Sequence, residues 1–204
     1  MTSDGFTPAQ ASAVSALSLK AVHKLIDGHL IRPRRMRVGG KTQRRLSQEQ
    51  LVYLGLEAEG VRLLPLAVRR EIARMIETSP EVEQLSISEG SALIIRVKPV
   101  RRAVKQQLAR LKKAQQMAIS QKEVMQGTPV YRGTRIPIEL VAEMLSGGAS
   151  IDEILEGYPA LAREQVELAP LYVLAFPRRG RPVRRPWAQQ KPLRVTRRAG
   201  AVTS

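Results

Sequence analysis

The chain has 204 residues, a formal net charge of +16 and no cysteine. The lack of cysteine excludes disulfides, thiolate metal sites and a thiol nucleophile. No apolar run approaches the ~20 residues of a membrane-spanning helix, and residues 1–10 lack the charged-then-apolar pattern of a signal peptide. We therefore expect a soluble, cytoplasmic protein with one or two modest domains and aliphatic cores.

The charge is unevenly distributed along the chain. Residues 32–45 contain seven basic residues and residues 177–204 contain nine, and neither segment contains an acidic one. Residues 119–176 hold four basic against eight acidic residues, a net charge of −4. Cationic segments of this kind are typical of a protein that binds a polyanion or an acidic protein surface.

The chain begins with two predicted short helices. Thr7-Pro8 predicts the start of the first, and Ser18 is a suitable N-cap for a second helix that ends at Asp27-Gly28. The apolar residues of the second helix share one face: Leu19, Val22, Leu25 and Ile26. A different face carries the polar side chains Lys20, His23 and Lys24. A helix that enters the major groove of DNA needs such a second face, with donors to bases and phosphates.

A basic segment follows, in which Gly39-Gly40 predicts a hairpin turn. Its cations are Arg32, Arg34, Arg35 and Arg37 on one arm and Lys41, Arg44 and Arg45 on the other. A basic hairpin directly after such a helix resembles the winged helix-turn-helix of MerR-like heads. The expected DNA-binding set is therefore these seven residues with Ser18, Lys20, His23 and Lys24. The alternative is a surface helix followed by a solvated basic loop. His23 and His29, with Asp27 nearby, do not assemble a four-ligand metal site.

The middle of the chain alternates helices with one more hairpin. Ser47 and Gln50 form a predicted capping box, and Pro65 predicts the start of a helix. On that second helix we expect Arg69, Arg70 and Arg74 to face outward. Residues 82–88 and 92–97 predict a β-hairpin around Glu89-Gly90. Pro99 predicts the start of a long basic helix with an apolar stripe that indicates a connector or a dimer seam: Val100, Val104, Leu108 and Leu111.

Residues 127–169 predict an extended lead-in and three helices. Pro137 precedes the first helix, Gly147-Gly148 ends it, and Ser150 with Glu153 forms a capping box for the second. Helix, short glycine turn and helix form a helix-turn-helix-like arrangement. In the third helix Pro170 predicts a kink or an early stop, because an interior proline costs ~3 kcal/mol.

The motifs of this stretch are Gly127-Thr128-Pro129-Val130, Arg132-Gly133-Thr134-Arg135-Ile136-Pro137, Glu143, Gly148-Ala149-Ser150 and Tyr158-Pro159. Together they closely resemble the small domain of VapB-type antitoxins, although Ala162 stands where a Ser or Thr cap is usual. The resemblance implies a partner, a toxin similar to PIN-domain ribonucleases, and autorepression through operator DNA. From the residues themselves, the extended lead-in offers an unpaired edge, and we expect a homodimer through Val130, Tyr131, Ile136 and Val141.

The tail from Pro177 is rich in arginine and proline and cannot bury enough apolar surface to fold alone. The carboxylate-lined active site implied for the toxin would attract cations, and arginine binds a carboxylate in two places at once. The expected toxin-binding residues are Arg178, Arg179, Arg181, Arg184, Arg185 and Trp187. The alternative is a solvated tail that adds non-specific DNA affinity, and residues 179–182, Arg-Gly-Arg-Pro, resemble an AT-hook.

The sequence contains no recognisable catalytic constellation, so we expect a non-enzyme without cofactor or metal. We predict a mainly α fold with small β elements, in three parts. Residues 1–118 form a winged helix-turn-helix DNA-binding region with a hairpin and a connecting helix, residues 119–176 a helix-turn-helix-like dimerisation domain, and residues 177–204 a partner-binding tail. The leading hypothesis is a type II antitoxin. The alternatives are a stand-alone transcriptional regulator and an architectural DNA-binding protein.

Overall fold

The computed structural model describes residues 5–89, 91–121 and 127–178. Over these residues the protein is mainly helical with three small antiparallel hairpin-like pairs of strands. The elements are α1 (Pro8–Ser15), α2 (Leu19–Asp27), β1 (Arg34–Val38), β2 (Lys41–Arg45), α3 (Gln48–Glu59), the 3-10 turn η1 (Val61–Leu63), α4 (Leu66–Thr78), β3 (Gln84–Glu89), β4 (Ser91–Arg96), α5 (Val97–Met117), β5 (Ala118–Ile119), β6 (Val130–Tyr131), α6 (Ile138–Ser146), α7 (Ile151–Gly157) and α8 (Arg163–Ala175). None of the described helices is long and apolar enough to cross a membrane.

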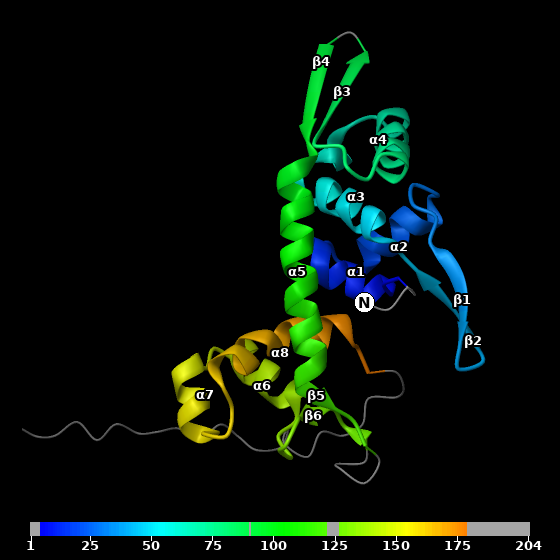
Figure 1. Ribbon diagram of the computed structural model, residues 1–204. Helices are drawn as coiled ribbons and strands as arrows, with labels where there is room; N and C mark the ends of the chain where they lie inside the picture. The colour runs from blue at the N-terminus through cyan, green and yellow to red at the C-terminus, as the bar shows by residue number, and fades with distance from the viewer. Residues whose placement is uncertain (1–4, 90, 122–126, 179–204) are drawn as a thin grey trace, which may run out of the picture.

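Helix α5 is the axis of the molecule (Figure 1). The β3–β4 hairpin lies at its beginning, α1 to α4 lie along one side, and β5, β6 and α6 to α8 gather at its end. The apolar stripe expected on this helix is buried or half-buried, and three of its residues, Val100, Val104 and Leu111, belong to one core together with Val97 at the start of the helix. The last turns contribute Ala114 and Met117 to a second core. One helix therefore supports both apolar clusters.

The first core is built by α1 to α5 and the β3–β4 hairpin. Thr7 begins α1 and the capping box of Ser47 with Gln50 begins α3, as the sequence predicts, and the structure adds a capping box between Thr7 and Gln10. Helix α3 crosses α5 at Gly55, where an added Cβ would stand 2.6 Å from a methyl group of Val100. A glycine is needed there because the two helices approach too closely for a side chain.

A buried polar network joins α3 to α4. Glu57 is only 2% exposed, and its carboxylate accepts hydrogen bonds from the Tyr53 hydroxyl and, at 2.9 Å each, from Nε and Nη2 of Arg69. Burial, reinforced by the Glu57 carboxylate, raises the pKa of Tyr53. The expectation that Arg69 faces outward is therefore wrong: it turns inward because a buried carboxylate needs a paired cation. Arg70 and Arg74 are exposed as expected.

The second core holds α6, α7, α8 and the end of α5. Its lead-in strand β6 pairs with β5, with Ala118 opposite Tyr131 and Ile119 opposite Val130. The lead-in is therefore not an unpaired edge. Val130, Tyr131 and Val141 are fully buried in the chain and Ile136 is half-buried, and burial raises the pKa of Tyr131.

Helix α8 continues through Pro170 to Ala175, so of the two outcomes expected at this proline, a kink or an early stop, the early stop is wrong. Packing at both ends holds the helix across the missing hydrogen bond. Ala169, before the proline, is buried in the second core, and Ala175, after it, is buried in the first. The start of α8 lacks a Ser or Thr cap, but the Gln165 side chain accepts from the Ala162 N–H at 2.8 Å. Helix α8 thus packs on α1 as well as on α5 and α6.

Candidate nucleic-acid interface

Helix α2 presents a polar face to solvent, as its periodicity predicts. Ser18 Oγ accepts from the Ala21 N–H at 3.2 Å and begins the helix. Val22, Leu25 and Ile26 are buried against the first core. The exposed side chains include three of the predicted DNA-binding residues, Lys20, His23 and Lys24. Leu19 was expected on the apolar face but is 38% exposed, because the first turn of α2 extends beyond the core.

The β1–β2 hairpin has the predicted turn, with Gly39 and Gly40 both at positive φ. Its register places Arg35 opposite Arg44 and Arg34 opposite Arg45. Side chains alternate between the faces of a strand, so the two arginine pairs lie on opposite faces of the hairpin. Like charges directly opposite one another destabilise a strand pair. The hairpin therefore gathers cations at a cost to its own stability, which an anionic ligand would offset.

The seven predicted hairpin cations do not have equal surroundings. Five of them have exposed side chains and form no ion pair with a carboxylate in the described part of the chain: Arg32, Arg34, Arg35, Arg37 and Lys41. Arg44 is exposed but donates from Nη1 to Asp27 Oδ1 at 2.9 Å. This pair was missed at the sequence level, because residues 17 positions apart meet only after the hairpin folds back on α2.

Arg45 serves the hairpin itself. Its side chain is half-buried and donates to Gln43 Oε1 at 3.0 Å and to the Gly5 carbonyl at 3.5 Å. Two backbone hydrogen bonds between Phe6 and Leu46, of 2.8 and 2.7 Å, hold the start of the chain against the end of β2. Gly5 has a positive φ, and a side chain at this position would clash, because an added Cβ would lie 2.7 Å from the Leu46 carbonyl oxygen. Arg45 thus ties β2 to the start of the chain and offers little surface to a ligand.

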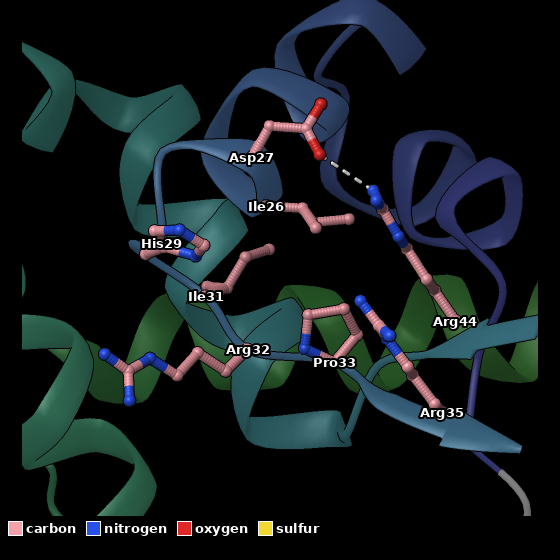
Figure 2. A pocket seen from close by; sticks show the side chains of 8 residues that line it. All are labelled: Ile26, Asp27, His29, Ile31, Arg32, Pro33, Arg35 and Arg44. Carbon is pink, nitrogen blue, oxygen red and sulfur yellow. Dashed lines mark hydrogen bonds and ion pairs between the residues drawn. The ribbon is translucent and has the colours of Figure 1, made fainter.

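A hollow of about 280 Å³ separates the end of α2 from the hairpin. Figure 2 shows Arg35 and Arg44 extending from the strands toward the end of α2, where the Asp27 carboxylate meets Arg44. Arg32 extends in the other direction. The wall also includes His29 and Arg32, and its apolar part is formed by Ile26, Ile31 and Pro33. The hollow brings two predicted cations from different strands, Arg35 and Arg44, to one carboxylate.

A wider groove of about 730 Å³ lies between α1, α2, β2 and the end of α8. Its wall includes three predicted DNA-binding residues, His23, Lys41 and Arg44, and also Phe176 and Pro177. The chain therefore leaves α8 beside the polar face of α2. Arg178 lies 3.6 Å from Glu139 of α6. The other residues expected to bind a toxin lie outside the described part of the chain: Arg179, Arg181, Arg184, Arg185 and Trp187.

The second pair of short helices, α6 and α7, has a surface charge opposite to that of α2 and the hairpin. Helix α7 exposes Asp152, Glu153 and Glu156 and contains no basic residue. Hydrogen bonds from the Ser150 backbone and hydroxyl lower the pKa of Glu153, and Asp152 pairs with Arg163. Over the described residues, no group of three or more His, Asp or Glu side chains is arranged to hold a metal ion.

Comparisons with known proteins match a segment of this chain to a family model and most of its length to a relative. Residues 119–173 match the family model described as "Protein of unknown function (DUF433)". The "Uncharacterized protein y4eO" of Sinorhizobium fredii is 30% identical over 188 residues, which cover 84% of this chain and 81% of that protein. The crystal structure of Rv2018 from Mycobacterium tuberculosis aligns with 81% of this chain and 96% of its own at 13% identity and a TM-score of 0.36. Residues 119–173, which match the DUF433 model, are called the DUF433 segment below, and the chain as a whole belongs to the same family as y4eO.

Proposed function

We propose that the protein is a DNA-binding repressor whose N-terminal part, α1, α2 and the β1–β2 hairpin, binds duplex DNA as a winged helix-turn-helix. The observation that carries this proposal is the exposed cationic surface shared by α2 and the hairpin. Helix α2 contributes Lys20, His23 and Lys24, and the hairpin contributes exposed arginines on both of its faces. The order of the elements is that of a recognition helix followed by a wing.

In this proposal the basic side chains have two roles. Backbone phosphates supply most of the binding free energy and are contacted by lysine and arginine. The short α2 helix supplies the few side chains that reach base edges in the major groove, with Ser18 and Lys20 at its start. Helix α7 is excluded from this role, since three exposed carboxylates would be driven against phosphates.

We also propose that the repressor is the antitoxin of a type II pair, a non-enzymatic partner of a PIN-like ribonuclease. The support is the resemblance of residues 127–159 to VapB-type antitoxins and the density of arginine after residue 177. The rival is a stand-alone regulator, in which the DUF433 segment only dimerises or binds another partner. Under both hypotheses the protein would act as a homodimer. Because Val130, Tyr131 and Val141 are buried within the chain, the dimer contact needs a different surface.

The DNA-binding proposal is tested with fluorescently labelled duplex from the region upstream of the protein's own reading frame. Replacing both Lys20 and Lys24 by alanine should lower the affinity on the order of tenfold and reduce the salt slope by about 1.8, for two lost phosphate contacts. A matched control is the double replacement of Lys105 and Lys112, which are exposed on α5. Equal losses in both double variants would show that α2 is not the recognition helix.

The antitoxin proposal is tested with the product of the adjacent reading frame. Expression of that frame alone should arrest growth, and co-expression should restore it. Truncation after Phe176 should abolish inhibition in an RNA cleavage assay while operator binding persists. Full inhibition by the truncated protein would remove the tail from the mechanism, and failure of the two proteins to co-purify would favour the stand-alone regulator.

A further inference from the structure

Asp27 occupies a position that a phosphate group would also fit. It is the last residue of α2, and its carboxylate lies 2.9 Å from Nη1 of Arg44 on the facing hairpin. The side chains of Asp27 and Arg44 are 62% and 43% exposed, so solvent reaches both. Ion pairs this exposed contribute about 0–1 kcal/mol to stability. Another anion can therefore displace the carboxylate at small cost.

Arg35 supplies the second half of the site. It stands directly opposite Arg44 in the strand register and extends toward the same hollow (Figure 2). Among the described residues no carboxylate forms an ion pair with Arg35, so one carboxylate faces the two guanidinium groups of Arg35 and Arg44. Each guanidinium presents a planar fork that binds two oxygens of a phosphate. The pair therefore lacks one anionic partner.

The shape of the hollow also suits this ligand. Its volume of about 280 Å³ is several times the ~30 Å³ that one water molecule occupies in the liquid. Ile26, Ile31 and Pro33 form an apolar wall beside the arginines. Because the hollow lies between α2 and the hairpin, a strand of DNA held by both elements would pass across it. A helix C-terminus such as that of α2 repels anions, so the arginines must supply the attraction.

We propose that Arg35 and Arg44 bind one backbone phosphate of DNA, and that Asp27 competes with that phosphate for Arg44. The inference rests on the proposed DNA binding and adds a residue that opposes it. When DNA binds, the phosphate displaces the carboxylate, and the two anions then repel each other across the site. Asp27 thereby lowers the affinity for every duplex, whatever its sequence, because a backbone contact carries no sequence information.

Asp27→Asn is the informative variant, since it keeps the size of the side chain and removes the charge. It should bind both the operator duplex and a random duplex about two- to fivefold more tightly, the factor that corresponds to a coupling of up to about 1 kcal/mol. Arg35→Ala and Arg44→Ala should weaken both duplexes and lower the salt slope by about 0.9 each. Glu71→Gln is the matched control, because Glu71 is another exposed carboxylate paired with an arginine, Arg74 at 3.7 Å.

The result that overturns the inference is an Asp27→Asn affinity equal to those of the wild type and of Glu71→Gln. If the Lys20 and Lys24 double variant still loses affinity in that experiment, DNA binding by α2 stands and only the phosphate site is lost. If the wild-type protein binds no duplex, both proposals are wrong. A second arm titrates inorganic phosphate at constant ionic strength. Binding of inorganic phosphate that Asp27→Asn strengthens, without an effect on DNA, would assign the site to a free anion and overturn the DNA assignment.

Discussion

The two cores of this protein share helices α5 and α8 but have surfaces of opposite charge. The core of α1 to α4 carries the exposed cations of α2 and the hairpin, whereas the DUF433 segment exposes the carboxylates of α7. Both contain a pair of short helices joined by a tight turn, so the backbone arrangement alone does not separate a DNA-binding unit from a protein-binding one. Charge and its placement separate them. Under the proposed function, two similar helix pairs in one chain would therefore serve different partners.

The largest effect is expected from a substitution at the end of α8 that disrupts the packing between the two cores. Ala175 is buried in the first core, and Ala175→Asp would bury an unpaired carboxylate at a cost on the order of 4 kcal/mol. We expect one thermal unfolding transition by circular dichroism, shifted to a much lower temperature. Leu174→Asp is the control, because Leu174 is 63% exposed. Two separate transitions in the wild-type protein would contradict this joint unfolding.

A smaller effect is expected within the first core alone. Arg69→Ala removes the cation that pairs with buried Glu57 and should cost about 2–3 kcal/mol, below the full value for a buried pair because the Arg69 side chain is 17% exposed. Arg70→Ala, at an exposed neighbouring position, should be close to neutral. Chemical denaturation with a common slope measures the difference. Equal stability of the two variants would mean that Glu57 is protonated or hydrated without Arg69.

DNA-binding measurements at matched salt can compare the contributions of the two helix pairs to DNA affinity. Asp152→Ala and Glu156→Ala in α7 should leave operator binding unchanged or slightly tighter, whereas loss of Lys20 and Lys24 should weaken it on the order of tenfold. The physical reason is that removing a carboxylate near DNA removes repulsion, not a contact. Loss of binding only in the α7 variants would reverse the assignment of the two helix pairs.

The smallest effect is expected in the pH dependence of stability, through the carboxylate of Glu153 at the start of helix α7. The pKa of Glu153 is lowered by hydrogen bonds from Ser150, so its ionised form stabilises the start of α7. That contribution is complete above the ordinary pKa of a glutamate, ~4.3, and is lost as the pH falls through the lowered value. We expect Glu153→Gln to show a weaker loss of stability between neutral and acid pH than the wild type, measured by thermal unfolding. Identical pH profiles would show that the capping carboxylate contributes nothing.

Local rules predicted much of the fold. The capping residues Thr7, Ser18, Ser47 and Ser150 begin the expected helices, and Gly39-Gly40 forms the expected turn, because each depends on residues within one or two turns of the chain. The failures depend on distant partners. Arg69 turns inward toward Glu57, and β6 pairs with β5. Pro170 stays within α8 because cores on both sides hold that helix, which periodicity in a single segment cannot reveal.

In the candidate site too, local patterns predicted which residues are exposed, but contacts between distant residues were not predicted. The exposed residues of α2 and most of the hairpin cations follow from the alternation and periodicity of the sequence. The sequence did not show that Arg45 is half-buried against Gly5 or that Asp27 faces Arg44. The available signal was an acidic residue at the end of a helix that is otherwise basic, since its charge opposes that of its surroundings. Its partner could be found only from the position of the hairpin.

The contact between α1 and α8 has a consequence for the synthesis of the protein. Ala11 and Ala175 lie in the same core although about 160 residues separate them along the chain. At roughly 5–20 residues per second, a ribosome takes on the order of 8–30 s to make the intervening chain. During this interval the part of α1 that packs on α8 is exposed to solvent, so the emerging chain depends on its own solubility or on chaperones. The last described helix of the protein thus completes the packing of the first.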